Sequence, residues 1–149
     1  MTIRRFALAA TAVAAFTALP AHAQTEIQWW HSMGGALGEW VNDLAKEFNA
    51  SQSAYKVTPT FKGSYDESMT AAIAAFRAGN APHILQVFEV GTATMMASKG
   101  AIVPAAKVMN DAGFKFDPTQ YVSAVAGYYT APNGQMLSYP LNSSTTIFY

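Results

Sequence analysis

The sequence predicts an α/β protein built from βαβ units around a mostly parallel sheet. Between residues 26 and 99, three strand-like segments alternate with helix-like segments at the spacing that parallel crossovers need. The third strand-like segment, residues 84–88, is almost wholly apolar, as expected for a strand covered on both faces. Glycine and proline separate these segments, and the sequence contains no internal repeat.

The first strand and the first helix are predicted at residues 26–30 and 37–48. Polar and apolar residues alternate along the strand before an aromatic end. Gly34 and Gly35 then break the chain, and the polar residues 49–53 end the helix. Between these limits, apolar residues recur at the spacing of one helix face: Leu37, Trp40, Val41, Leu44, Ala45 and Phe48.

The second strand and helix follow in the same order. Residues 55–61 alternate, and Pro59 within them indicates an edge strand or a bulge. Ser64 and Glu67 have the spacing of a capping box, so a helix is expected to begin there. Its apolar face and its stop signals are Met69, Ala72, Ile73, Phe76, Gly79, Asn80 and Pro82.

The rest of the chain is less regular. A short helix rich in Ala and Met is predicted at residues 92–99, and two further helices that begin with proline are predicted at 104–112 and 118–126. Residues 135–140 and 145–149 have strand composition. Because the last of these strands stops without a turn or a polar tail, we expect the sequence to be truncated.

Residues 1–23 are predicted to be a cleaved secretory signal peptide. Arg4 and Arg5 precede an uncharged apolar run, and Ala21-His22-Ala23 is a small-x-small cleavage site. The run is shorter than the roughly 20 residues that a membrane span needs. The mature chain should therefore begin at Gln24 and act in the periplasm; a retained N-terminal anchor is the alternative.

Composition and spacing exclude several classes of site. The chain has no cysteine, so disulfides, thiolate metal sites and Cys nucleophiles are excluded. Without the signal peptide, seven basic residues face nine acidic ones, which disfavours nucleic acid and anionic membranes as partners. His22, His31 and His83 lack metal-ligand spacing, and His31-Ser32 has no nucleophile elbow, which favours packing for His31. We predict no cofactor, metal or catalytic set.

Candidate ligand residues lie after the predicted strands, because ligands of open α/β sheets bind at the carboxyl ends of the strands. The three loops are residues 30–35, 62–65 and 89–92. Glu89 follows an apolar strand, where its carboxylate could accept hydrogen bonds from hydroxyl groups or cap the next helix. Tyr65 could line a ligand or pack in the core.

Two further polar segments allow alternative interpretations. Asp66 suits the positive end of a helix dipole, which accounts for it without a ligand. Residues 142–145 offer amide and hydroxyl groups that suit a phosphate or a polyol, but such residues also form ordinary turns.

Five segments also carry a resemblance to a known family: residues 30–33, 62–65, 72–82, 84–98 and 140–144. Together they resemble the periplasmic glycerol-3-phosphate-binding branch of the extracellular solute-binding proteins, which serve ABC importers. The similarity covers the whole mature chain. It implies a lobe of the type II periplasmic-binding-protein fold. Since such proteins are considerably longer, residues 24–149 would be an incomplete N-terminal lobe, truncated before the second lobe.

The resemblance also implies a function and three ligand contacts. The ligand would be sn-glycerol-3-phosphate or a glycerophosphodiester such as glycerophosphocholine, delivered to ABC permease subunits with their ATPase. Glu89 would accept hydrogen bonds from glycerol hydroxyls, while Tyr65 and Ser144 would donate to hydroxyl or phosphate oxygens; no role passes to Asp66. The alternatives are a binding protein for a neutral sugar or oligosaccharide, and an exported hydrolase with Glu89 and Asp66 as its carboxylate pair.

Overall fold

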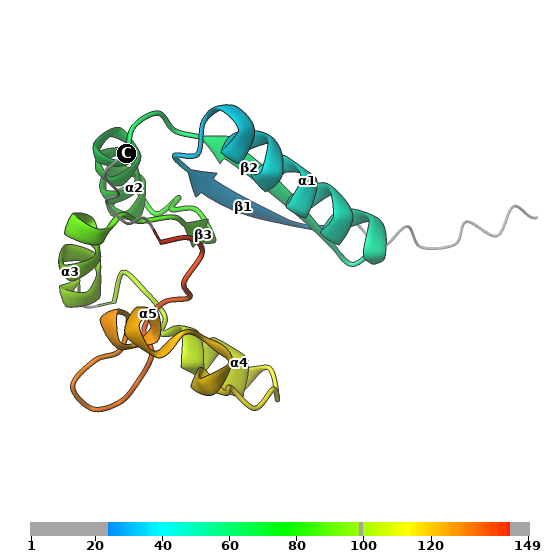
Figure 1. The fold of residues 1–149 in the computed structure, drawn as a ribbon. Coiled ribbons are helices and arrows are strands. Elements are labelled where there is room, and N and C mark those ends of the chain that lie inside the picture. Colours follow the sequence, from blue (N-terminus) through cyan, green and yellow to red (C-terminus); the bar gives the residue numbers. More distant parts are fainter. Residues whose placement is uncertain (1–23, 99, 144–149) are drawn as a thin grey trace, which may run out of the picture.

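The computed structural model of the chain describes residues 24–98 and 100–143, which form two regions (Figure 1). The sheet region, residues 24–98, contains all three strands and their helices. The second region, residues 100–143, contains short helices and loops that lie below the sheet in this view. The predicted signal peptide, the predicted strand at 145–149 and Ser144 lie outside the described residues.

The sheet is parallel and has the order β2-β1-β3, which confirms the predicted fold class. Its strands are β1 (Thr25–His31), β2 (Tyr55–Phe61) and β3 (Ile84–Leu85). β1 pairs with β2 along its whole length, whereas β3 pairs only with Trp29 and Trp30, near the carboxyl end of β1. Pro59 lies in β2, at one edge of the described sheet, where proline is tolerated.

β3 is shorter than the predicted strand at residues 84–88. The helix that follows β3, α3 (Glu89–Ala97), begins three residues earlier than expected. Because Phe88 is the N-cap of α3, the chain leaves the sheet before that residue. Gln86 still donates its amide to the Trp30 carbonyl at 2.9 Å, but its side chain bends back to the chain after β1. The prediction of strand at 86–88 was therefore wrong, and Glu89 lies in a helix rather than in a loop.

α1 (Gly35–Ser51) covers one face of the sheet and begins slightly before the predicted helix. Val41 and Ala45 are buried, but other members of the predicted apolar face, such as Leu37 and Phe48, stay about half exposed. An apolar hollow of about 360 Å³ remains between α1 and the sheet. Its lining is Ile27, Trp29, Leu44, Ala45, Phe48, Tyr55, Val57 and Ile84.

α2 (Tyr65–Arg77) begins at the predicted capping box. Ser64 Oγ accepts a hydrogen bond from the Glu67 amide at 3.3 Å, and a Glu67 carboxylate oxygen accepts one from the Ser64 amide at 2.7 Å. The carboxylate accepts hydrogen bonds from the Ser64 amide and from the Ser64 hydroxyl, and these two bonds lower the pKa of the Glu67 carboxyl group. Right-handed crossovers run from β1 to β2 and back from β2 to β3, so α1 and α2 lie on opposite faces of the sheet.

The second region departs more from the predicted elements. α4 (Ala105–Asp111) matches the expected helix, although Pro104 is its N-cap rather than a first-turn residue. The helix expected at 118–126 is divided into a 3₁₀ turn, η1 (Pro118–Gln120), and α5 (Ser123–Tyr128). Asp117 caps the start of η1 by accepting a hydrogen bond from the Thr119 amide, and the extended backbone at Tyr121 ends this turn before α5 begins.

The strand expected at residues 135–140 is also absent from the described structure. A single antiparallel bridge joins Met136 to Thr130 across a tight turn at Gly134. The rest of this segment is instead used to hold α4, since the amides of Ala105 and Ala106 donate to the carbonyls at residues 137 and 136. This segment therefore has the composition of a strand, but the described residues supply no strand for it to pair with.

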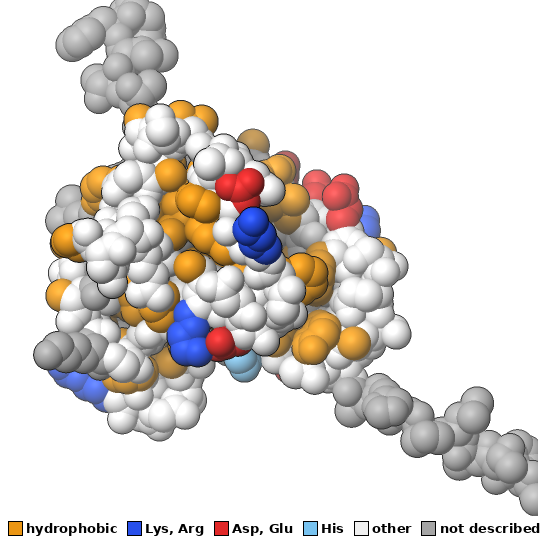
Figure 2. All heavy atoms as spheres, turned by 90° about the horizontal axis from the view of Figure 1, so that it is seen from below, with side chains coloured by type: hydrophobic (Ala, Val, Ile, Leu, Met, Phe, Trp, Pro, Cys, Tyr) orange, Lys and Arg blue, Asp and Glu red, His pale blue; other side chains and the backbone are white. Residues whose placement is uncertain are grey.

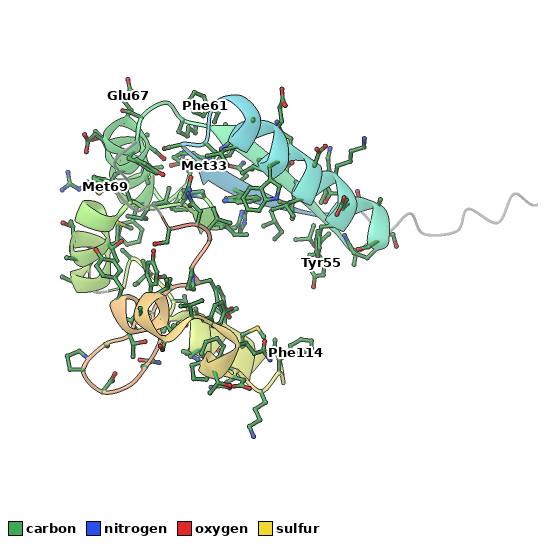
Figure 3. All side chains as sticks on the ribbon, in the orientation of Figure 1. Met33, Tyr55, Phe61, Glu67, Met69 and Phe114 are labelled. Atoms are coloured by element: carbon green, nitrogen blue, oxygen red, sulfur yellow. The ribbon has the colours of Figure 1, made fainter. Side chains whose placement is uncertain are left out.

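Few large side chains are buried in the second region. Met136 is only 2% exposed and the small Ala105 and Ala126 are also buried, whereas Phe114 and Val122 are largely exposed. Phe114 projects away from the end of α4 (Figure 3). Seen from below, the molecule carries several apolar patches between few charged side chains (Figure 2). Among the helices of residues 24–98 and 100–143, none has the length and apolar composition needed to cross a bilayer.

Candidate functional site

The candidate site lies at the carboxyl edge of the sheet, where the three parallel strands end together. The chain leaves β1, β2 and β3 through residues 32–34, 62–64 and 86–88. Backbone bonds hold these exits side by side: the Lys62 amide donates to the His31 carbonyl at 2.9 Å, and the Gln86 amide donates to that of Trp30. The three strand exits therefore lie together at one edge, although the third predicted loop, residues 89–92, lies within α3.

Tyr65 is the first residue of α2 and is half-buried at this edge. Its ring stacks on Phe88, with the centroids 5.2 Å apart and the planes 20° from parallel. Phe88 is the N-cap of α3, and Glu89 follows it as the first helical residue. The fold thus brings the backbone of Glu89 next to the aromatic pair, while the Glu89 side chain lies outside the described part.

The absence of a side chain at Gly91 leaves room for the Phe88 ring. A Cβ atom at Gly91 would lie 2.9 Å from Phe88 Cε1, 2.9 Å from Met69 Sδ and 3.1 Å from Val87 Cγ1. Met69 lies on α2 and points toward α3 (Figure 3). Close packing between the two helices therefore needs a glycine here, and it holds the ring on which Tyr65 stacks.

The chain returns to the same edge just before Ser144. Asn142 accepts a hydrogen bond from the Gln86 amide group at 3.4 Å and directs its own amide toward the sulfur of Met33 at 4.0 Å. Gln86 in turn accepts the Ser32 amide at 3.0 Å. Asn142 lies two residues before Ser144, so the chain approaches the predicted site, although Ser144 itself is not described.

Lys62 was not singled out from the sequence. Its Nζ lies 3.8 Å from the centroid of the Trp30 ring, in a cation–π contact across the ends of β1 and β2. A cation in the loop after a strand was the available signal, but the partner ring could be identified only from the structure. Gln86 was missed in the same way, since one polar residue in an apolar run gave no indication of its partners.

His31 packs in the core, as expected. It is 3% exposed, and its ring lies about 6 Å from those of Trp29 and Phe61. Burial lowers the pKa of the imidazole, and its Nδ1 accepts the Met33 amide at 3.3 Å. Among the described residues, no three His, Asp or Glu side chains gather as a metal site would require.

An open hollow of about 520 Å³ lies beside this edge, on the α1 side of the sheet. His31, Met33, Gly38 and Phe61 are among its lining residues, and Tyr65 is not. Asp66 is exposed on the first turn of α2. The described part of the candidate site is therefore an open wall of aromatic and polar groups rather than a closed cavity.

Comparison with known proteins gives one family and a consistent set of relatives. Residues 32–149 match the family described as bacterial extracellular solute-binding protein. The chain is 53% identical over 139 residues to the sn-glycerol-3-phosphate-binding periplasmic protein UgpB of Rhizobium meliloti. The aligned residues cover 93% of this chain and 32% of that protein.

Two further relatives carry the same name. The protein from Brucella abortus is 56% identical over 87% of this chain and 30% of its own length. The protein from Salmonella typhimurium is 53% identical over the full chain and 34% of its own length. The chain therefore spans about a third of the length of the curated relatives that it matches.

Proposed function

We propose that this chain, which belongs to the bacterial extracellular solute-binding protein family, is part of the N-terminal lobe of a periplasmic binding protein for sn-glycerol-3-phosphate. The observation that carries the proposal is the identity of 53–56% to proteins named for binding this compound, over nearly the whole chain. Glycerophosphodiesters such as glycerophosphocholine are proposed as further ligands, and ABC permease subunits with their ATPase as partners.

The proposed role is binding without turnover. A second lobe would supply the opposite wall of the site and close over the ligand. The open wall at the carboxyl edge supports this arrangement, because hydrogen bonds to a polyol are nearly balanced by those to water until the ligand is buried. Full-length protein should therefore release neither phosphate nor choline from these compounds, as a chromatographic assay would show.

Tyr65, Glu89 and Ser144 are the proposed ligand contacts of this lobe. Two observations support the grouping: Tyr65 stacks on the residue before Glu89, and Asn142 bonds to the loop after β3. Glu89 would accept hydrogen bonds from the glycerol hydroxyls, and the Tyr65 and Ser144 hydroxyls would donate to the ligand.

Titration calorimetry on the full-length protein tests both proposals. sn-Glycerol-3-phosphate should bind, whereas maltose, a neutral sugar, should not. Glu89→Gln should weaken binding about tenfold to a hundredfold, since a charge-assisted hydrogen bond contributes about 1.5–3 kcal/mol. Asp66→Asn is the matched control and should bind normally. Maltose binding would reject the ligand proposal; unchanged affinity in Glu89→Gln would remove Glu89 from the site.

We propose that residues 1–23 direct export and are then cleaved off after Ala23. Mass spectrometry of periplasmic material should then find Gln24 as the first residue. A protein that begins at Met1 in that fraction would overturn the proposed cleavage.

A further inference from the structure

We propose that Lys62, held on the Trp30 ring, is the residue of this lobe that attracts the ligand's phosphate group; this inference rests on the proposed function. The ammonium group lies 3.8 Å from the ring centroid, so its position is fixed by a cation–π contact. Ordering a flexible lysine before the ligand arrives lowers the conformational cost of binding.

Lys62 has the right place for this role. Trp30 alternates with Trp29, which faces α1, so Trp30 faces the opposite side of the sheet, where α2 lies. Tyr65 begins α2 on that side, three residues after Lys62. The charge therefore lies at the same sheet edge, and on the same face, as the aromatic pair of the candidate site.

Lys62 has no ion-pair partner among the described side chains. Lys62 is the one Lys or Arg in residues 32–34, 62–64, 86–88 and 140–143. The ion pair found in the described part joins Lys107 to Asp111 in α4, so no described carboxylate neutralises Lys62. The Glu67 carboxylate accepts two hydrogen bonds from Ser64 and keeps its charge, but it forms no ion pair with Lys62. A partly buried cation without an acidic partner suits an anionic ligand.

The chemistry of the ligand makes the proposal testable. A phosphomonoester carries a charge of about −1.5 to −2 at pH 7, whereas the phosphate of a diester carries a single negative charge. Attraction by one fixed cation should therefore be stronger for sn-glycerol-3-phosphate than for glycerophosphocholine. It should also be screened by salt, because Lys62 is half-exposed.

The experiment compares Lys62→Met with Lys56→Met in the full-length protein by stopped-flow binding. Lys56 lies at the other end of β2, about 20 Å away at 3.3 Å per residue. Its removal changes the net charge equally, but at a distance beyond the Debye length of about 10 Å at 0.1 M salt. At about 0.1 M salt, Lys62→Met should slow association of sn-glycerol-3-phosphate about threefold to tenfold, with a smaller effect on glycerophosphocholine. At about 0.5 M salt, where the Debye length is about 4 Å, the difference should largely vanish.

Two outcomes would overturn the inference. One is equal behaviour of Lys62→Met and Lys56→Met at every salt concentration. The other is a loss that is the same for both ligands and insensitive to salt, which would indicate a packing defect. Lys62→Arg keeps the charge and should retain the wild-type salt dependence, which separates charge from folding. If wild-type protein binds neither phosphate compound, the proposed function fails and this inference fails with it.

Discussion

The sheet region and the second region are stabilised by different kinds of contact. In the sheet region, β1 pairs with β2 at seven consecutive positions, so each pair supports the next. In the second region, single hydrogen bonds join loops to α4, and the rings of Phe116, Tyr121 and Tyr139 pack about 6 Å apart. The first region is a repeated pattern, while the second depends on individual contacts.

This difference has a consequence for the candidate site, because the site uses both regions. The exits of the strands come from the sheet region, and Asn142 comes from the second. The three tryptophans, Trp29, Trp30 and Trp40, all belong to the sheet region, so tryptophan fluorescence reports on that region separately. The stability of the two regions can therefore be compared within one chain.

The largest expected effect is in the second region. Met136→Ala should lower the free energy of unfolding by about 2–5 kcal/mol, because it empties a site that is only 2% exposed. Hydrogen exchange read by mass spectrometry should show lost protection around residues 130–139, with a smaller change in β1. Met109→Ala, at a half-buried position, is the control. Equal loss in both regions would show that they unfold as one unit.

A glycine exchange compares the regions directly. Gly91→Ala should destabilise the protein by about 1–3 kcal/mol, because the new methyl group meets the Phe88 ring and Val87. Displacement of Phe88 should also weaken ligand binding through Tyr65. Gly127→Ala in α5 is the matched control: its Cβ would meet nothing within 4 Å, so a neutral or slightly stabilising change is expected. Thermal unfolding of both variants tests this, and the same result at both positions would contradict it.

The capping box should contribute less. Ser64→Ala should cost about 1 kcal/mol in urea denaturation followed by tryptophan fluorescence. Hydrogen bonds from Ser64 lower the pKa of Glu67 below its ordinary 4.5, so its contribution is present above that pH and is lost as the pH falls through the folded-state pKa. Glu67→Gln should reduce this acid sensitivity. An unchanged pH profile would show that the carboxylate adds nothing to the cap.

The smallest expected effect is the titration of His31. Burial lowers its pKa below 6.5, so the unfolded chain takes up a proton there before the folded chain does. Stability from this residue is thus complete above pH 6.5 and declines as the pH falls from 6.5 toward the folded-state pKa. His31→Asn should flatten the dependence of the free energy of unfolding on pH in that interval. A wild-type stability that rises on acidification through the interval would contradict the assignment.

How well the sequence predicted the molecule depended on the range of each interaction. The capping box of Ser64 and Glu67 was readable because both partners lie within one helical turn. The contact of Gln86 with Asn142 joins residues 56 positions apart, and no local pattern indicates it. Met136 had strand composition, but a strand also needs a neighbouring strand, which the described fold does not supply at that position.

Pro59 has a further consequence for the behaviour of the sheet in a crowded compartment. An edge strand offers free backbone donors and acceptors to any extended peptide, including another copy of the same chain. Proline is tolerated in such a strand where its missing N–H would face solvent, so the outer side of β2 lacks a donor near its middle. A peptide that paired with this edge would lack one backbone hydrogen bond at Pro59. Pro59 therefore makes β2 a poor template for intermolecular strand addition.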